Sequence, residues 1–469
     1  MNNPETDDLS ALLDRQRAAW RENEPTPAQR LRDLGKLREV LKRRFDELAD
    51  AMSADFGRRS KHESLLTDGM TVLHEIDHQR RHLARWSRSR HRLADWLFWP
   101  ARTEVQYRAL GVVGIISPWN YPVNLALIPL VSAIAAGNHV MLKPSEHTPR
   151  TSALLRELLA EVFPAERVST VLGGPELAAR FASLPFDHLF FTGSTEIGRK
   201  VMAAAAPNLT PVTLELGGKS PAIIAPGYPI DTAAQRIAAG KLLNAGQTCI
   251  APDYVLVAND QREAFVAAMR AYVLRHYPDL TTTPDYTSIV HDGHYRRLHA
   301  LVEEARAAGA EVVTLPADSA HDAGRRVFAP TLIVDPDPSL HVMQEEIFGP
   351  ILPVIGYARI EEAVAFVNAR PRPLAFYHFD LERRRTRGVL KAILAGGATV
   401  NDCVLHIAQS ELPFGGVGPS GMGHYHGHAG FLTFSKQMPV LYQARWSSMA
   451  LLRPPYAKLA DFVTRLLTR

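Results

Sequence analysis

Hydrophobic and polar positions follow two different periods along the chain. Residues 9–92 are rich in Leu, Ala and Arg, nearly free of glycine, and place their apolar side chains at helical spacing. From about residue 103, short β-branched runs alternate with helical segments. This part predicts strands at 111–117, 139–143, 168–172, 188–192 and 211–216, helices at 123–136 and 151–163, and shorter helices beginning near 176 and 195.

A second alternating set follows Glu215. The pattern predicts strands at 221–225, 254–258, 310–315, 330–334, 351–355, 374–379 and 398–401, and helices at 231–243, 261–275, 293–308, 360–369 and 384–396. Strand–helix repeats of this kind form parallel sheets with helices on both faces, joined by right-handed crossovers. The chain is therefore predicted to be an α/β protein with two doubly wound parallel-sheet domains.

The last part of the chain is different in composition. After about residue 404 it is glycine-rich and irregular. Residues 456–469 place five apolar side chains on one helical face, those of Leu459, Phe462, Val463, Leu466 and Leu467. Such a helix suits either packing on its own protein or a membrane surface, and we expect the first.

Composition indicates an ordinary globular protein. Of its 469 residues 46% are hydrophobic and 22% are charged. Two cysteines far apart do not make a disulfide framework, which favours a reducing compartment. No apolar run reaches the ~20 residues that span a bilayer, and the polar start lacks a signal-peptide pattern. We therefore expect a cytoplasmic protein without an integral membrane segment.

The net charge is +4, and the positive charge is concentrated in residues 78–93, where six arginines surround Trp86. A nucleic-acid-binding face and a solvated basic helix end both produce such a segment. No nucleic-acid-reading motif accompanies it, so we expect no nucleic-acid partner.

A glycine turn lies between a strand and a helix in the segment 190–200, "FFTGSTEIGRK". Gly193 and Ser194 turn the chain, and Gly198 falls in the first turn of the helix. A helix N-terminus offers free N–H groups and a positive dipole end, which suits a pyrophosphate. The spacing differs from the usual dinucleotide-binding fingerprint, and a capped tight turn would look the same.

Polar residues follow three other strands. Asn120, in "SPWNYP", can donate to a developing oxyanion or can be an ordinary turn residue. Lys143 and Glu146 stand at a strand end, where open α/β sheets bind ligands, and can contact ribose or phosphate. Glu215 ends an apolar strand. Burial there raises a carboxyl pKa and suits a general base, although a strand cap is the alternative.

Cys249 lies in "NAGQTCIAP", in the connection between a helix and a strand. Most free cysteines are inert core residues, whereas loops on a rigid scaffold often carry reactive groups. If Cys249 is a nucleophile, we expect an activated thiolate that is labelled rapidly at neutral pH. Two further motifs, "QEEIFGP" at 344–350 and "ELPFGGVGPSG" at 411–421, follow.

Two histidine patterns resemble metal sites. "HEIDH" at 74–78 matches H-E-x-x-H, with His74 and His78 as ligands and Glu75 as base. The arginines that follow oppose a cation, and no third ligand is obvious. "HYHGH" at 424–428 is more typical of an irregular surface segment. We therefore predict no metal.

Taken together, these segments resemble the aldehyde dehydrogenase superfamily over nearly the whole chain. They are most similar to its short, class-3-like branch, which includes bacterial coniferyl aldehyde dehydrogenases. The markers are "DFGRRS" (55–60), "LPFDHLFFTGST" (184–195), "NAGQTCIAPDYVLV" (244–257), "YTSIV" (286–290) and "PFGGVGPSGMGHYHG" (413–427). Their agreement in order makes the resemblance specific.

The resemblance implies roles for individual residues. Cys249 matches the nucleophile, Glu215 the general base, and Asn120 the oxyanion amide, acting with the backbone N–H of Cys249. The cofactor, NAD or NADP, is implied to contact Trp119, Lys143, Glu146, Gly193, Ser194, Gly198, Leu216, Gly217, Glu346 and Phe348. Glu146 near a ribose 2′-hydroxyl disfavours a 2′-phosphate, whereas Lys143 and Arg150 offset this effect.

The resemblance also implies how the chain is divided. Residues 1–92 and 110–214 would form the dinucleotide-binding domain, and 215–404 the catalytic domain. Residues 93–109 and 423–442 would form an oligomerisation arm, with a helical tail at 443–469. A homodimer is expected.

The implied reaction oxidises an aldehyde to a carboxylic acid through a thiohemiacetal and a thioester on Cys249. The small-molecule substrate is expected to be aromatic, such as coniferyl aldehyde, or medium-chain aliphatic. Two alternatives remain. One is an acylating or semialdehyde dehydrogenase, although Glu215 argues against it, and the other is a catalytically idle binding protein. Cys403 either borders the substrate tunnel or lies in the core, and we expect the core.

Overall fold

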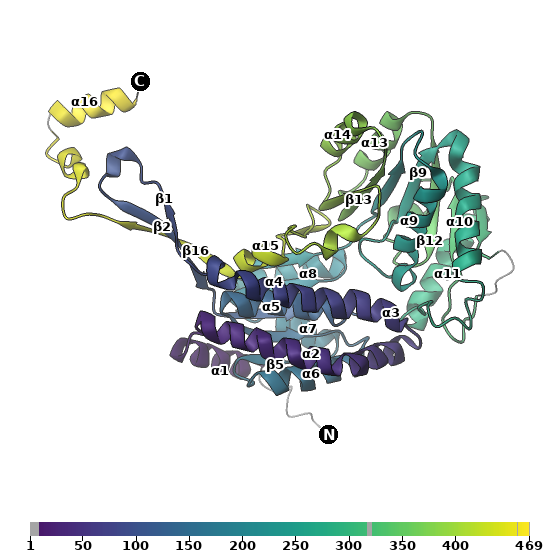
Figure 1. Cartoon of the computed structure of the whole chain (residues 1–469), viewed down its shortest axis with the longest axis horizontal. Helices are drawn as coiled ribbons and strands as arrows, with labels where there is room; N and C mark the ends of the chain where they lie inside the picture. Colours follow the sequence, from purple (N-terminus) through teal and green to yellow (C-terminus); the bar gives the residue numbers. More distant parts are fainter. Residues whose placement is uncertain (1–8, 317–320, 457, 469) are drawn as a thin grey trace.

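The computed structural model describes residues 9–316, 321–456 and 458–468. The two alternating regions of the sequence form two sheets that helices cover, and a third, small sheet leaves the body as an arm (Figure 1). The predicted α/β class with two sheet domains is thereby confirmed.

The first sheet has six strands. Their spatial order is β15 (Gly421–Met422), β7 (Val212–Glu215), β6 (His188–Thr192), β3 (Val112–Ile116), β4 (His139–Lys143) and β5 (Val168–Thr170). All pairs are parallel except that of β15 with β7. Every residue of β3, β4 and β6 is buried, which explains their continuous apolar sequences.

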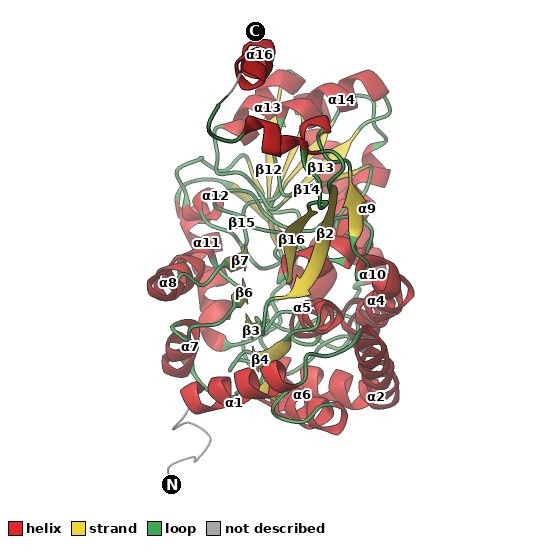
Figure 2. Cartoon of the chain, turned by 90° about the vertical axis from the view of Figure 1, so that its left-hand side faces the viewer, coloured by secondary structure: helices red, strands yellow, loops and turns green. Residues whose placement is uncertain are grey.

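Helices from the first half of the chain surround this sheet (Figure 2). They are α1 (Leu9–Glu22), α2 (Pro27–Phe56), α3 (Lys61–Ser64), α4 (Thr71–Trp86), α5 (Asn124–Ala136), α6 (Pro149–Val162), α7 (Pro175–Ala182) and α8 (Thr195–Ala205). A π-helical segment, η1 (Leu65–Met70), joins α3 to α4. Helix α5 is buried on all sides, so it carries no amphipathic stripe.

The second sheet has seven strands. Their order is β10 (Glu311–Thr314), β11 (Thr331–Val334), β12 (Ile351–Tyr357), β9 (Tyr254–Ala258), β8 (Pro221–Ile224), β13 (Ala375–Phe379) and β14 (Gly397–Val400). Only β10 runs antiparallel to its neighbour. The associated helices are α9 (Ile230–Leu242), α10 (Arg262–His276), α11 (Asp292–Ala307), α12 (His341–Gln344), α13 (Ile360–Asn368) and α14 (Arg383–Ala392).

The strand order of the first sheet brings its polar strand ends together. Parallel strands end at one edge of a sheet, and β7, β6, β3 and β4 are neighbours in that sheet. The residues that follow them in sequence therefore meet at one edge. These residues include Asn120, Lys143, Ser194 and Glu215.

The arm is an antiparallel sheet of β1 (Arg90–Arg92), β2 (Arg102–Ala109) and β16 (Ser435–Tyr442). Helix α15 (Gly427–Thr433) precedes β16 and packs on α4 and α5 of the body. The C-terminal chain therefore joins the arm only from Ser435.

The C-terminal helix contacts its own chain, but at the end of the arm and away from the body (Figure 1). Helix α16 (Lys458–Leu467) lies at the far end of the arm, beyond β1 and β2 (Figure 1). It contacts the short helix η7 (Ser448–Leu452), and Phe462 is 63% exposed. The pattern revealed the apolar face but not the distance of the helix from the core. Within the described ranges, no helix has the length and hydropathy to cross a membrane.

Candidate active site

Cys249 follows a tight turn between α9 and β9. Asn244 and Ala245 in this turn both have a left-handed backbone, with φ of 51°. This conformation costs about 1–2 kcal/mol for each non-glycine residue, so the surrounding structure must hold it. The Glu63 carboxylate of α3 accepts a hydrogen bond from the Asn244 backbone N–H at 3.1 Å and another from Thr287.

Asn120 and Gln247 connect this turn to the end of β3. The Asn120 side-chain amide donates to the Gln247 carbonyl at 3.1 Å, and the Asn244 amide donates to the Asn120 carbonyl at 3.0 Å. Gln247 itself is fully buried and donates to Ser288. The amide of Asn120 therefore lies against the loop that carries Cys249.

Two pockets meet at Cys249. The first, of about 180 Å³, is mostly apolar and contains no charged side chain. Its walls include Leu66, Met70, Tyr121, Leu125, Leu243, Val404 and Ile407. The second, of about 320 Å³, extends to the carboxyl ends of β6 and β7 and includes Asn120 and Glu215. A carbonyl group bound at Cys249 would therefore be open to the apolar pocket on one side and to the larger pocket on the other.

Cys403 lies in the core, as expected. Its side chain is 1% exposed and belongs to the main hydrophobic cluster. It is not part of the wall of the apolar pocket, to which the next residue, Val404, contributes. The two cysteines of the chain therefore differ in access, and Cys249 is the accessible one.

The two carboxyl groups of the larger pocket both have raised pKa values. Glu215 is 2% exposed, neither of its oxygens has a hydrogen-bond partner among the described residues, and burial raises its pKa well above the ordinary range. Burial and the charge of Asp253 raise the pKa of Glu346 to about 8, although the positive charges of Lys219 and Arg297 act in the opposite direction.

The expectation of a resting thiolate is wrong for this structure. Burial, and then the charges of Glu346 and Glu215, raise the pKa of the Cys249 thiol. No cationic side chain acts on it to offset these effects. The thiol is therefore neutral at physiological pH until a positive charge or a base approaches.

The larger pocket fits a polar, extended cofactor. Gly193 and Ser194 line it at the start of α8, where the Ser194 hydroxyl caps the Ile197 N–H. Thr192 Oγ1 and Glu346 Oε1 are buried and have no hydrogen-bond partner among the described residues, so they are free to contact a ligand.

Glycines keep this pocket open and bring its walls together. A Cβ on Gly217 would overlap the Glu346 carboxylate. Gly198 does not line the pocket; a Cβ there would lie 2.6 Å from Leu216 Cδ2, so Gly198 allows α8 to pack closely on Leu216. Leu216 and Gly217 both line the pocket.

An aromatic wall closes one side of this pocket. Trp119 and Phe348 meet edge to face, with ring centroids 5.4 Å apart, and His294 contacts both rings. The His294 ring nitrogen lies 3.0 Å from the Phe348 carbonyl, at a residue with φ of 53°. The wall thus holds Phe348 in a backbone conformation that is rare for its type.

Lys143 and Glu146 form an ion pair at the end of β4. Lys143 Nζ donates to Glu146 Oε2 at 2.6 Å, with the lysine 2% exposed and the glutamate 32% exposed. Burial alone would raise the pKa of Glu146, but the hydrogen bond and charge of Lys143, a backbone N–H and the charge of His147 together outweigh burial and hold that pKa below its ordinary value. An ionised carboxylate therefore faces solvent beyond β4.

Sequence reasoning missed a buried ion pair behind the site. Arg59 donates to Asp68 at 2.8 Å and to the Asn120 carbonyl at 2.6 Å. The other oxygen of Asp68 accepts the N–H groups of Val123 and Asn124, at the start of α5. Both charged side chains are fully buried. Arg59 stands in "DFGRRS", but nothing local in that motif shows which carboxylate it meets.

Residues 5–440 match the model of the aldehyde dehydrogenase family, so the chain belongs to that family. It is 48% identical to a probable coniferyl aldehyde dehydrogenase of Pseudomonas aeruginosa, over 99% of this chain and 97% of the relative. It is 45% identical to a coniferyl aldehyde dehydrogenase of a Pseudomonas species, over 96% and 94% of the two chains.

Solved structures agree with this assignment. The substrate-bound Staphylococcus aureus AldH covers all of both chains, with a TM-score of 0.93 and 35% identity. A Mycobacterium tuberculosis aldehyde dehydrogenase complexed with NAD⁺ has a TM-score of 0.83 and 27% identity, over 92% of this chain and 89% of its own. The protein is an enzyme that oxidises an aldehyde with NAD or NADP.

Replacing Arg59 by methionine would leave the buried Asp68 carboxylate without its cation. We expect Arg59→Met to lower the free energy of unfolding by about 3–5 kcal/mol in urea titrations. Lys200→Met, which removes an exposed pair with Glu196, is the control and should cost under about 1 kcal/mol. Equal small effects of the two variants would contradict a supporting role for Arg59.

Proposed function

We propose that this enzyme oxidises uncharged aromatic aldehydes, of the kind represented by coniferyl aldehyde, to carboxylic acids. The observation that carries the proposal is the apolar pocket that opens directly onto Cys249 without any charged side chain. Two of the similar relatives are named as coniferyl aldehyde dehydrogenases, one of them as probable, which supports the same substrate class. A charged aldehyde would lose its hydration in this pocket without finding a partner.

Cys249 is the proposed nucleophile. Its thiol passes its proton to the Glu215 carboxylate or to water as the sulfur attacks the aldehyde carbon, so that a C–S bond forms, the C=O π bond breaks and the carbonyl oxygen gains the negative charge. The Asn120 side-chain amide and the Cys249 backbone N–H would hold this oxyanion, and one such donor is typically worth about 3–4 kcal/mol. Collapse of the oxyanion restores the carbonyl as a thioester.

The larger pocket would hold the nicotinamide cofactor, which would supply the acceptor for the hydride that the former aldehyde carbon loses. Trp119, Phe348 and Glu346 would position its reactive end. Gly193 and Ser194 would hold its pyrophosphate at the start of α8, with Gly198, Leu216 and Gly217 shaping that cleft.

Lys143 and Glu146 are proposed to contact the adenosine ribose. Because Lys143 keeps Glu146 ionised, the carboxylate repels a 2′-phosphate, and we expect NAD to be preferred over NADP.

Glu215 is the proposed general base. It would take a proton from the water that attacks the thioester, so that the acid leaves and the free thiol of Cys249 returns. Its buried carboxyl group, without any hydrogen-bond partner in the protein, can accept a proton without first breaking another contact.

The proposed division of the chain follows the two sheets. The cofactor domain spans residues 1–89 and 110–214, since Arg90–Arg92 form β1 of the arm and are not part of this domain, contrary to the expectation from the sequence. Residues 215–404 form the catalytic domain, and the arm formed by β1, β2 and β16 joins two copies in a homodimer. Exposed Leu93, Trp96 and Trp99 on the arm support an interface there, because large apolar side chains rarely gather on a monomer surface.

Cys249→Ala is expected to reduce acid formation to background, because no other accessible thiol can form the thioester. Cys403→Ala is the matched control and should keep most activity, since that sulfur lies in the core. Reduced cofactor is measured by absorbance and the acid by chromatography. Undiminished turnover by Cys249→Ala would rule out Cys249 as the nucleophile.

A raised pKa of Glu215 predicts a pH dependence. The carboxylate that accepts the proton of water is populated only as pH rises through this pKa, so kcat should increase from acidic to alkaline pH. Glu215→Gln should retain a burst of reduced cofactor, lose steady-state turnover and show no such increase. Formation of an acyl-coenzyme A instead of the acid would favour the acylating alternative.

The substrate class is tested with a panel of aldehydes. We expect kcat/KM for coniferyl aldehyde to exceed that for succinic semialdehyde by at least about 100-fold, because the carboxylate of the latter meets no cation in the apolar pocket. A medium-chain aliphatic aldehyde is the uncharged control. Preference for the charged aldehyde would contradict the proposal.

A further inference from the structure

The H-E-x-x-H pattern of α4 does not assemble as a metal centre. Glu75 is 1% exposed, and its carboxylate accepts hydrogen bonds from the Gly427 N–H and the Gln79 amide, both at 2.8 Å. It therefore ties α4 to α15. His74 lines a different surface hollow, with Asp77 and Arg80.

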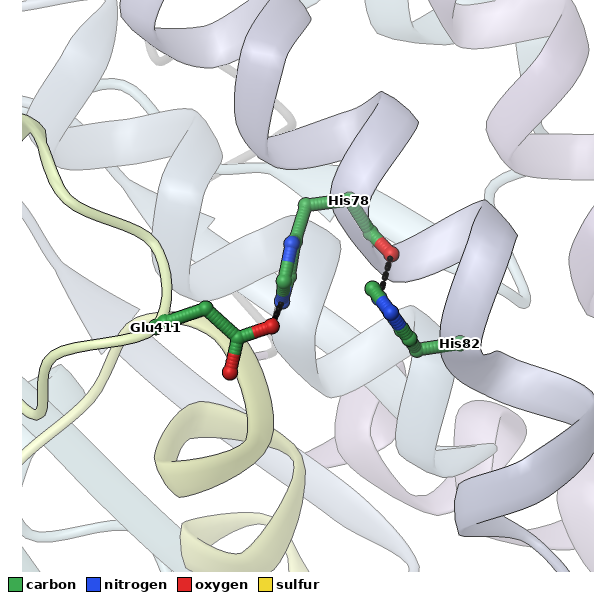
Figure 3. Close-up of side chains that lie close together, drawn as sticks. All are labelled: His78, His82 and Glu411. Carbon is green, nitrogen blue, oxygen red and sulfur yellow. Dashed lines mark hydrogen bonds and ion pairs between the residues drawn. The ribbon is translucent and has the colours of Figure 1, made fainter.

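A second histidine spacing on the same helix does meet a third potential ligand. His78 and His82 lie one turn apart, and Glu411 approaches them from the segment before β15 (Figure 3). One nitrogen of each ring and one carboxylate oxygen all lie within 4.8 Å of one another. His78 Nε2 is 3.5 Å from Glu411 Oε1.

The buried nitrogen of His78 makes no hydrogen bond. His78 is 4% exposed, and its Nε2 has no hydrogen-bond partner among the described residues, although Glu411 Oε1 lies 3.5 Å away, at ion-pair distance. A metal ion bound by both atoms would satisfy a buried nitrogen that the protein's own groups leave without a hydrogen bond. Glycine at 427 leaves room there, since a Cβ would lie 3.2 Å from His78 Nε2.

His82 is held in the orientation of a metal ligand. Its Nδ1 lies 2.9 Å from the His78 carbonyl oxygen, which can only accept, so the proton resides on Nδ1 and Nε2 keeps its lone pair. Metal-binding histidines commonly donate their other ring N–H in this way. The ring also stacks on the buried Trp86, with centroids 5.3 Å apart.

We propose that His78, His82 and Glu411 bind one divalent transition-metal ion, with Zn²⁺ as the best fit. Two imidazoles and one carboxylate are ligands that Zn²⁺ prefers. Tetrahedral bonds of about 2.1 Å place neighbouring ligand atoms about 3.4 Å apart, close to the observed His78–Glu411 separation. Glu411, whose side chain is 72% exposed, can rotate to shorten its distances to the two rings.

The nearby arginines do not prevent His78, His82 and Glu411 from binding a metal ion. Arg80 pairs with Asp77 at 3.6 Å, and the Arg81 guanidinium donates to the Asp77 carbonyl, so both are directed to another part of the helix. Exposed charges are also screened by salt over about 10 Å.

Such an ion would fasten the segment from Glu411 onwards to α4. That segment leads to β15, in which Gly421 pairs with Glu215 at the end of β7. None of the three ligands lines either pocket at Cys249. The proposed role is therefore a structural clamp rather than a part of the reaction.

The test uses the full-length, tag-free protein in a Cys249→Ser background, which removes the accessible thiol. Calorimetric titration with Zn²⁺ should show one ion per chain, and Co²⁺ should give the visible absorption of a four-coordinate site. His82→Gln and Glu411→Gln should each weaken Zn²⁺ binding by at least about tenfold. His74→Gln, on the same helix, is the matched control and should bind as tightly as the parent.

Thermal unfolding supplies a second measurement. Zn²⁺ should raise the Tm of the parent and of His74→Gln, but not that of Glu411→Gln. Because Glu411 is exposed, this variant tests the ligand without disturbing the core. Absence of stoichiometric binding, or equal affinity in all three variants, would overturn the proposal. Loss of binding in His74→Gln alone would assign the ion to the H-E-x-x-H pattern instead.

Discussion

The left-handed turn at Asn244 and Ala245 is the constraint on which the active site depends. It reverses the chain between α9 and β9 and leaves Cys249 where two pockets meet. The turn is unfavourable by itself, and buried hydrogen bonds from α3, from Asn120 and from Gln247 hold it. The geometry of the sulfur is thus set by contacts that are far apart in sequence, and the Arg59–Asp68 pair extends the same support to α5.

The electrostatics of the site favour neutral groups at rest. Burial raises the pKa of Cys249, Glu215 and Glu346 together, and each ionised carboxylate would raise the pKa of the thiol further. A resting thiolate at Cys249 is therefore unfavourable. The proposed nucleophile would gain its charge only as substrate and cofactor fill the site, which would couple its formation to assembly of the reacting complex.

The sequence predicted those features that depend on neighbouring residues. Apolar runs revealed the buried strands, and polar residues directly after them gave Asn120, Lys143, Ser194 and Glu215. Features made by distant segments were not accessible in this way. Strand β15 has only two residues and pairs with β7, a strand that lies 206 residues earlier in the sequence (Gly421 with Glu215), and α16 has an amphipathic pattern that does not say where it lies. Arg59 belongs to a motif, yet its partner Asp68 does not stand out in the sequence.

Helix α4 shows why spacing alone could not identify a metal site. His74, His78 and His82 follow one another at intervals of about one helical turn. The helix therefore presents two overlapping pairs with the same spacing, His74 with His78 and His78 with His82. What separates them is the surface that packs against each pair. The Gly427 N–H engages Glu75, the residue that the H-E-x-x-H chemistry would need, whereas Glu411 approaches His78 on the side shared with His82. A ligand set is therefore decided by the segment that crosses the helix, and that information resides in the tertiary fold.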